Sequence, residues 1–508
     1  MSTKKPDNNL DFWILHPIWG LPLFFGVMYL LFLFTIGVGG IFQDAFDILG
    51  RALFVAWPDQ VTQALNCPLW FRVLILGLGN GVCTVLTFIP VLMSLFVGLG
   101  VLAQSGYLQR AARVADRLTR FFGLPGQALI PLLIGLGCNV PAILETRLLT
   151  QTRDRVLTIM MLPFVSCGAR LAVYAVFVSA FFKGAGYTVI FLLYLTGVLA
   201  ALLTAVLFRW AWSTPRSAEN GVKKTGPEPL SPYQVWRLRP IIRQAWVRVC
   251  RFIRKVGLLI LPCCVVLSCL SAWQPSVQLG LASFSQRLSP VLEPMGIQPS
   301  NWPATVGLLS GLLAKEAMIA SLSALYAPEI PGPSVAVAAS TGLGWMQSLR
   351  QAGDSVCTNA NLWLQRSLRP WHLDIQESRM DPLAQQAMRV HFGSNAAAFA
   401  YLLFVLLYFP CISVVAVIRK ELNGYWAALS VIWSSGLAYT LAVLCYQGHR
   451  WAVSAPGAGA EALVWMGRAL GLLFLLVLLV RLAVARLSGF TQPITPVRGK
   501  SLPVRVLG

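Results

Sequence analysis

The sequence predicts an all-α, polytopic integral membrane protein with about eight transmembrane helices and two re-entrant, broken helices in an inverted repeat. Three observations lead to this fold class. More than half of the 508 residues are apolar, only 12% are charged, and the mean hydropathy is +0.68. That balance leaves too little polar surface for a soluble chain of this length. Long apolar runs recur along the chain, and glycine, proline or charge interrupts two of them.

The eight predicted spans are apolar runs long enough to cross the hydrocarbon core. In chain order they are 21–43, 73–102, 157–182, 187–208, 256–272, 395–418, 424–446 and 463–485. The run 73–102 is long enough to tilt or kink, and the run 256–272 is short. Two further apolar segments, 127–143 and 303–326, are interrupted and are interpreted as re-entrant helices.

Loop charge predicts the orientation. The segment 209–255 has eleven Lys or Arg and two acids, which is typical of a cytoplasmic loop, whereas 327–393 has five of each, as a translocated loop can. The net charge of +21 does not indicate nucleic-acid binding, because the basic residues lie in loops beside apolar runs. Eight crossings from a cytoplasmic N-terminus place every strongly basic loop on one side. If either re-entrant segment were a full span, the loops after it would be inverted.

This topology predicts a domain organisation for a multi-pass membrane protein, with both termini cytoplasmic and lipid as its surroundings. The parts are a short cytoplasmic N-terminus (1–19), a first transmembrane half (20–208) with a gate segment (127–182), a basic cytoplasmic loop (209–255), a second half (256–485) with a gate segment (303–326) and an outer loop (327–393), and a cytoplasmic tail (486–508). The first re-entrant segment is expected to enter from the cytoplasm and the second from outside. This opposite orientation is typical of inverted-repeat transporters with a site near the bilayer midplane.

The first gate segment has thiols beside helix-breaking residues. Cys138 lies in "GCNVP", where Gly137 permits close backbone approach and Pro141 removes an amide donor. The carbonyls freed one turn earlier, together with Asn139, are candidate ligands for an ion.

A second thiol, Cys167, lies in "PFVSCGAR" beside Ser166 and Gly168, with Pro163 before it and Arg170 after it. The second half has Cys411 directly after Pro410.

Three cysteines next to breaks suit a path for a fairly soft transition-metal cation, because thiolates favour such metals over Mg2+ or Ca2+. The alternative interpretation, which carries about equal weight for each of the three cysteines, is that the side chain is only a small apolar group buried in the core. That alternative is favoured for Cys263, Cys264 and Cys269. Eleven cysteines, several of them inside spans, do not resemble a disulfide framework.

The second gate segment carries two adjacent charges, Lys315 and Glu316, in an otherwise apolar stretch. A charge at the centre of a span costs roughly 2.5–3.5 kcal/mol on insertion scales. The two side chains point about 100° apart on a helix, so they do not neutralise each other. Glu316 is predicted to bind a cation or hold a gating contact, and Lys315 to pair elsewhere. The alternative is an ion pair that fixes helix packing. Glu145 is expected to pair with Arg147 or Arg170.

Four strings, "GLGCNVPAILETR", "RDRVLTIMMLPFVSCGARL", "NWPATVGLLSGLLAKEA" and "FGSNAAAFAYLLFVLLYFPCISV", resemble the membrane part of the FeoB-type bacterial ferrous iron transporters. The resemblance runs from about Trp19 to Ala485. It implies transport of ferrous iron (Fe2+) across the inner membrane into the cytoplasm. In that family the gate cysteines, here Cys138, Cys167 and Cys411, are proposed to line the iron path, and Glu316 is a natural addition. No bound cofactor is implied, since Fe2+ is the transported substrate.

The sequence departs from the family at two places. The family usually begins with a GTP-binding domain, and neither a G-x-x-x-x-G-K-[ST] phosphate loop nor an N-K-x-D motif occurs here. The alternatives are a separate GTP-binding protein on the cytoplasmic face, transport without nucleotide, or lost activity. Ala103 and Gln104 stand where the family commonly has an acidic pair, which would weaken any iron attraction or partner binding by those carboxylates.

Other functions stay open at this point. A permease of the same fold could carry another divalent metal or a small solute such as a nucleoside, although the thiols favour a metal. A membrane-bound enzyme is disfavoured because no G-x-S-x-G or H-E-x-x-H motif occurs, and a scaffold would not require charges at membrane depth. The spans are equally compatible with a dimer or a trimer.

Overall fold

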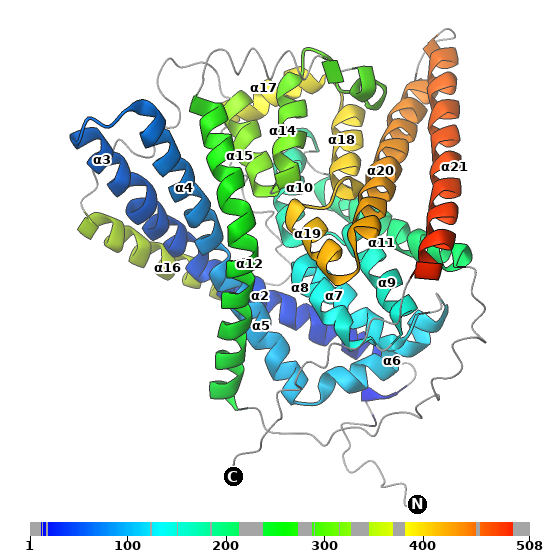
Figure 1. The fold of residues 1–508 in the computed structure, drawn as a ribbon, viewed down its shortest axis with the longest axis horizontal. Helices are drawn as coiled ribbons and strands as arrows, with labels where there is room; N and C mark the ends of the chain where they lie inside the picture. Colours follow the sequence, from blue (N-terminus) through cyan, green and yellow to red (C-terminus); the bar gives the residue numbers. More distant parts are fainter. Residues whose placement is uncertain are drawn as a thin grey trace, which may run out of the picture.

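The structure is a computed structural model that describes residues 12, 14–16, 19–121, 124–149, 151–182, 185–212, 237–272, 287–288, 290–313, 315–326, 345–368, 382–453 and 458–490. In this part of the chain the regular elements are helices and no strand occurs (Figure 1). The predicted all-α polytopic membrane fold is confirmed. For some helical residues, Glu316 among them, the backbone alone is described.

The elements of the first half are α2 (Gly20–Arg51), η1 (Ala52–Ala56), α3 (Trp57–Ala64), α4 (Leu69–Thr87), α5 (Ile89–Gln104), α6 (Tyr107–Phe121), η2 (Gly126–Ala128), α7 (Leu129–Gly137), α8 (Asn139–Glu145), η3 (Thr146–Leu148), α9 (Thr152–Met161), η4 (Leu162–Phe164), α10 (Gly168–Phe181) and α11 (Gly186–Ala211). Those of the second half are α12 (Leu238–Ala272), η5 (Glu293–Met295), α14 (Trp302–Leu313), α15 (Lys315–Tyr326), α16 (Trp345–Leu368), α17 (Pro382–Phe392), α18 (Asn395–Leu407), α19 (Ile412–Glu421), α20 (Gly424–Val453) and α21 (Ala458–Phe490).

Seven helical stretches of the described chain are long and apolar enough to cross a membrane. They are Pro22–Ala64, Trp70–Gln104, Thr152–Phe181, Gly186–Ala211, Asn395–Glu421, Gly424–Val453 and Gly459–Arg486. The eighth predicted span, 256–272, forms the second half of α12, behind a first half rich in arginine. Its 17 residues are at the lower limit for a crossing.

Two predicted spans differ in detail from the structure. The run 73–102 is two helices, α4 and α5, that meet at Phe88 because Pro90 starts the second one. The first span does not end at residue 43, since helix continues through a π-helical turn to Ala64. Figure 1 shows α3, α4 and α16 projecting from one side of the molecule. There Asn359 of α16 donates to Asp44 of α2 at 3.0 Å.

The segment 303–326 folds as a helical hairpin. A Cβ atom built on Gly307 would meet Leu322, and one built on Gly311 would meet Met318. The residue numbers of the two pairs have the same midpoint, at the junction of α14 and α15. Residues farther from the junction in α14 therefore contact residues farther from it in α15, so the two helices run antiparallel. At the open end of the hairpin, the hydroxyl of Tyr326 bonds the side chain of Asn301. The chain therefore enters and leaves on the same face, as a re-entrant segment does.

The helices α7 and α8 form the corresponding unit of the first half. Just ahead of α7, the amide of Gly126 donates to Asp116 of α6 at 2.9 Å. Just after α8, Arg147 binds Glu421 at the end of α19. Figure 1 shows α6, α7 and α8 in the lower half of the view and α14 and α15 in the upper half. The two broken segments thus reach toward each other from opposite sides.

Hydrogen bonds tie the segments predicted to be cytoplasmic to one another. Besides the Arg147–Glu421 pair, Arg248 lies 3.4 Å from Glu145, and the amide of Arg237 donates to Gln104 at 3.3 Å. The segments predicted to lie outside are joined in the same way at the other end. There Gln447 donates to the carbonyl of Pro294 at 2.7 Å, and the rings of Phe181 and Phe392 pack edge to face.

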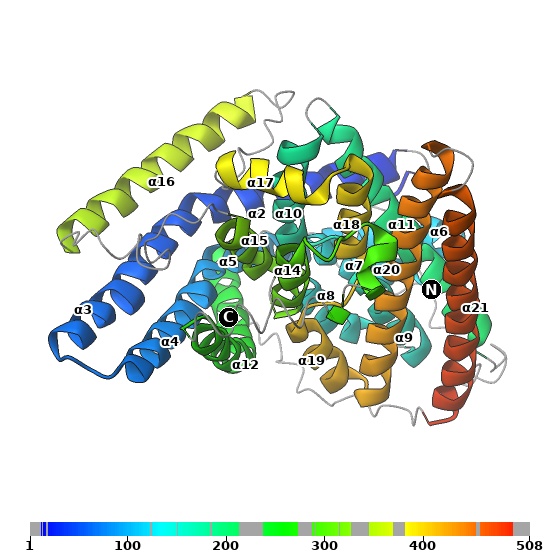
Figure 2. The same cartoon turned by 90° about the horizontal axis from the view of Figure 1, so that it is seen from above.

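Each half repeats one order of elements. A hairpin (α7–α8 or α14–α15) is followed by a helix with an extended break (α9–α10 or α18–α19) and then by a long helix (α11 or α20). Seen from above, α10, α14, α15 and α18 gather at the centre, and α21 lies at the edge (Figure 2). Because the two hairpins enter from opposite faces, this arrangement matches the predicted inverted repeat.

Candidate cation site

The break in the first hairpin is at Cys138, whose extended backbone (φ −156°, ψ 127°) separates α7 from α8. Pro141 has no amide hydrogen to donate to the carbonyl of Gly137, one turn earlier. This carbonyl faces α10, because a Cβ built on Gly168 would lie 3.9 Å from it. The geometry therefore leaves the carbonyl of Gly137 without the helical hydrogen bond that an amide at position 141 would donate. It also places the break at Cys138 beside the one at Cys167.

Asn139 follows the break and is 6% exposed. Its side-chain oxygen is buried and has no hydrogen-bond partner in the structure. Burying a polar oxygen without a partner costs free energy, so such an atom calls for an explanation. The absence of a side chain on Gly135 leaves room for it, since a Cβ there would lie 3.0 Å from the oxygen. An amide oxygen held in this way is a ready ligand for a cation.

The second break holds Cys167 just before α10, in extended backbone (φ −84°, ψ 164°). Arg170 is 2% exposed and donates to the carbonyl of Pro163 at 2.8 Å. Its guanidinium thus braces the turn between η4 and α10. Ser166 shares a hydrogen bond of 2.8 Å with Tyr174. These contacts fix the shape of the loop that presents the Cys167 thiol.

The matching break in the second half places Cys411 just before α19 (φ −54°, ψ 151°), after the buried Pro410. The Cys411 thiol is near enough to Cys167, Lys315 and Arg170 to interact with them electrostatically. Three of the predicted site and gate elements, far apart in the sequence, therefore converge. Cys167 and Cys411 occupy equivalent positions in the two halves, each at the N-terminus of the second part of a broken helix.

Lys315 lies at the tip of the second hairpin and is 4% exposed. Its ammonium nitrogen lies 3.6 Å from the ring centroid of Tyr408 and 3.5 Å from the carbonyl oxygen of Phe409. These two contacts are with the α18–α19 break; whether Lys315 also pairs with Glu316 stays a prediction. The side chain of Glu316 lies outside the described residues, as do those of Cys263, Cys264 and Cys269.

Within the described residues, no three His, Cys, Asp or Glu side chains gather closely enough to form a metal cluster. Cys138, Cys167 and Cys411 thus mark successive positions around the breaks, together with backbone carbonyls and Asn139.

Sequence reasoning missed the ion cluster at the end of α19. Glu421 accepts hydrogen bonds from Arg147 at 2.9 Å and also from Arg155. Its side chain is 4% exposed, and its carboxylate raises the pKa of the Arg147 guanidinium above the ordinary value. The expectation that Glu145 pairs with Arg147 or Arg170 is wrong, because Glu145 faces Arg248 of α12. The true partner of Arg147 is 274 residues away in the chain, and no local pattern indicates it.

Two tyrosines of α18 were also missed. Tyr401 donates to the carbonyl of Ala304 at 3.0 Å, and Tyr408 donates to the carbonyl of Leu308 at 3.1 Å. Their spacing of seven residues puts both on one helix face. That spacing was a usable signal. Together the two hydroxyls attach α18 along the length of α14.

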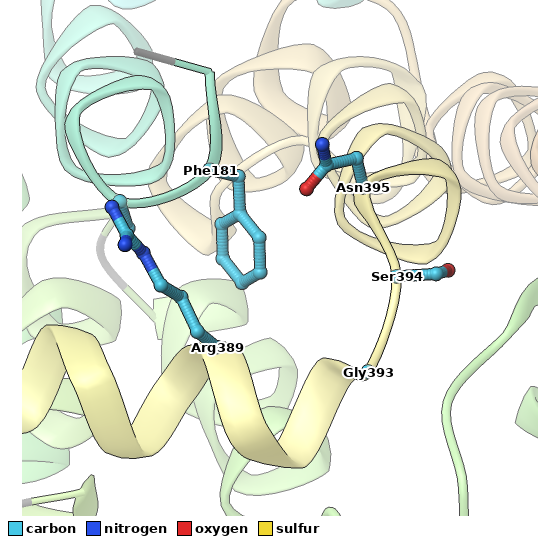
Figure 3. Close-up of a pocket in the computed structure, with 6 residues that line it drawn as sticks. Phe181, Arg389, Gly393, Ser394 and Asn395 are labelled. Carbon is cyan, nitrogen blue, oxygen red and sulfur yellow. The ribbon is translucent and has the colours of Figure 1, made fainter.

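A pocket of about 290 Å³ opens between the end of α10, the end of α17 and the start of α18 (Figure 3). Phe181, Arg389 and Asn395 are among its lining residues. It lies on the face where the α14–α15 hairpin enters. The arginine makes its lining positive, which disfavours it as a binding site for a divalent cation.

A protein-family model described as "Gate: Nucleoside recognition" matches residues 85–181 and 253–425, which together make up just over half of the chain and contain all four breaks. The chain belongs to the Gate family. The Fe(2+) transporter FeoB of Legionella pneumophila (strain Paris) is 40% identical over 479 residues, which cover 92% of this chain and 62% of that protein. The Fe(2+) transporters FeoB of Escherichia coli (strain K12) and Shigella flexneri are 37% identical over 444 residues, or 85% of this chain and 56% of theirs.

These similarities confirm the predicted resemblance to the membrane part of FeoB-type transporters. The Gate chain spans a little under two thirds of the length of the curated relatives it matches. No solved structure matches it. Gln104 lies at one of the two places where the sequence departs from the family. Its side-chain oxygen accepts a hydrogen bond from the backbone amide of Arg237, which joins α5 to the start of α12.

Proposed function

We propose that this Gate protein carries Fe2+ across the bacterial inner membrane into the cytoplasm, along a path between the two hairpins. The observation that supports it most is that Cys167 and Cys411 stand at equivalent helix breaks, close enough to interact electrostatically. Broken helices place backbone carbonyls and helix ends at membrane depth, where they bind ions. Thiols favour a transition metal over Mg2+ or Ca2+. The relatives bear the name Fe(2+) transporter.

The proposed path runs past three kinds of ligand. From the hairpin α14–α15 the ion meets Cys411 and then Cys167. Beyond them lie the carbonyl of Gly137, the thiol of Cys138 and the unpartnered oxygen of Asn139. Glu316, whose side chain lies outside the described residues, is kept in this proposal as a carboxylate near the tip of the upper hairpin.

Uptake of radioactive 55Fe2+ into proteoliposomes that hold the purified full chain tests this function. We expect Cys138→Ser, Cys167→Ser and Cys411→Ser each to lower uptake on the order of tenfold, because oxygen replaces sulfur on the path. The matched control is Cys445→Ser, a half-buried thiol of α20. Equal uptake in all four variants would remove the thiols from the path.

The variant Asn139→Leu tests whether the side chain of Asn139 binds the ion or only packs in the core. Leucine has a similar size and removes the unpartnered oxygen, so we expect the thermal stability to be unchanged or slightly higher. If the oxygen binds the ion, Fe2+ uptake falls on the order of tenfold all the same. Unchanged uptake would contradict this assignment.

The family description names nucleosides, and competition addresses that second candidate. Mn2+ and Zn2+ are expected to compete with 55Fe2+, since both accept thiol and nitrogen or oxygen ligands. A nucleoside is expected not to compete. Inhibition by uridine or adenosine at concentrations that leave free Fe2+ unchanged would favour a solute carrier of the same fold.

Control by a separate GTP-binding protein is a further part of the proposal. Exposed arginines on the first half of α12, Arg239, Arg243 and Arg251, form a basic surface that suits an acidic partner. Robust uptake by the chain alone, without nucleotide, would remove the need for such a partner. Crosslinking of the detergent-purified chain would show whether it forms a homo-oligomer.

A further inference from the structure

We propose that the ammonium group of Lys315 occupies the cation site at the α18–α19 break and that a divalent cation must displace it. This inference rests on the proposed function, because it assigns a tethered competitor to the same path. The lysine would then set the affinity and selectivity of the upper site.

The surroundings of Lys315 have the chemistry of a cation site. The Tyr408 ring presents its negative face to the ammonium at 3.6 Å from the centroid, and the carbonyl of Phe409 lies at 3.5 Å. Phe409 belongs to the break, so its carbonyl is not used within a helix. The C-terminus of α18, with the negative end of the helix dipole, lies at Leu407. A divalent metal ion is attracted by the last two of these features, the carbonyl oxygen and the negative end of the helix dipole.

Position and charge make the lysine a competitor. Lys315 interacts electrostatically with the Cys411 thiol, so its charge lies within the proposed ligand set. Arg170 adds a second positive charge to that thiol's surroundings, but its guanidinium is engaged by the carbonyl of Pro163. A divalent ion at Cys411 would meet twice the repulsion that a monovalent ion meets. The ammonium must therefore move away before such an ion binds.

The lysine has the freedom to do so. Its charge is carried by a flexible four-carbon stem, so the ammonium can swing while the backbone of α15 stays in place. The backbone around it is fixed more firmly. Gly311 of α14 packs directly against the hydroxyl of Tyr408, where an added Cβ would lie 2.5 Å away. Displacement of a side chain within a rigid frame accounts for a gate without large helix movements.

Labelling of Cys411 tests the inference without using iron transport. The full chain in proteoliposomes is treated with a cationic or a neutral methanethiosulfonate reagent, and modification at Cys411 is quantified by peptide mass spectrometry. In Lys315→Met, we expect the ratio of cationic to neutral rates to rise on the order of tenfold, because a nearby positive charge is lost. Lys315→Arg keeps the charge and is expected to keep the ratio. Lys420→Met, at the exposed far end of α19, is the matched control.

An unchanged ratio in Lys315→Met, or the same ratio in Met and Arg variants, would overturn the inference. Lys315→Gln replaces the Met variant if the latter does not purify. A measurement on the wild-type chain adds an independent arm: Fe2+ under anaerobic conditions should increase acetylation of Lys315 by acetic anhydride but not that of Lys420. If Fe2+ protects Cys411 while the reactivity of Lys315 stays constant, the two cations do not share the site.

The two proposals fail in different ways. Absence of Fe2+ uptake and of Fe2+ protection at Cys411 would refute iron transport. The reagent-charge ratio would still report on the position of the Lys315 charge. Normal iron uptake with a ratio insensitive to Lys315 would refute only the displacement of the lysine.

Discussion

The α7–α8 hairpin turns at uncharged residues, Cys138 and Asn139, whereas the α14–α15 hairpin has the buried charge of Lys315 at its tip. Their attachments differ as well. The first hairpin is held near its open end by ion pairs, Arg147 with Glu421 and Arg248 with Glu145. The second is held along its length by the hydroxyls of tyrosines.

The comparison shows how one backbone arrangement serves two environments. Ion pairs hold the first hairpin at a face where arginine side chains reach water, as the 56% exposure of Arg147 shows. Neutral hydroxyls hold the second inside the protein, where unpaired charge is expensive. The ammonium of Lys315 at its tip lies against an aromatic ring and a carbonyl. We therefore expect electrostatic changes to disrupt the first hairpin and steric changes to disrupt the second.

The largest effect is expected at the ion cluster. Removing one partner of a buried ion pair costs about 3–5 kcal/mol, and the half-exposed Arg147 places Glu421→Gln at the lower end, about 3 kcal/mol. Thermal unfolding in detergent measures it, with the exposed Glu461→Gln of α21 as control. Arg155→Ala should cost more than Arg147→Ala, because the Arg155 side chain is only 13% exposed. The reverse order would mean that burial does not govern this cluster.

An intermediate effect is expected from crowding the second hairpin. Gly311→Ala places a methyl group 2.5 Å from the hydroxyl of Tyr408, which overpacks the contact between α14 and α18. Overpacking of this kind costs about 1–3 kcal/mol. Gly353→Ala in α16 is the control, since nothing lies within 4 Å of its added Cβ. We expect that control to be neutral or stabilising, because alanine favours helix. Equal stability of both variants would show that the hairpin yields at this point.

The smallest effect is expected from single hydroxyls. Tyr401→Phe and Tyr408→Phe each remove one hydrogen bond to α14, at about 0.5–1.5 kcal/mol. Tyr408→Phe keeps the ring under Lys315 and should leave the labelling of Cys411 unchanged. Tyr425→Phe, which is 75% exposed, is the control. A loss comparable with that of Glu421→Gln would contradict the view that a single hydroxyl contributes less to stability than the ion cluster does.

Much of the fold was predictable because membrane insertion is governed by local hydrophobicity and loop charge. The spans, the two re-entrant segments and the breaks at Cys138, Cys167 and Cys411 follow from runs of apolar residues and from glycine and proline within them. The continuation of the first helix to Ala64 was missed because polar residues such as Asp44 and Asp47 appeared to end it. Those carboxylates are instead satisfied by Asn359 and Arg51.

The candidate site was predictable only as separate pieces. The sequence by itself determined the class of protein, the places where helices break and the residue types beside each break, because these depend on neighbours along the chain. Tertiary structure alone decided that Cys167 and Cys411 lie close enough to interact electrostatically, that Lys315 lies over Tyr408, and that Glu421 holds two arginines of the other half. Each of these pairings joins residues more than 90 positions apart in the chain. The sequence leaves many partners equally plausible for each residue, and the packing of the two halves selects one of them.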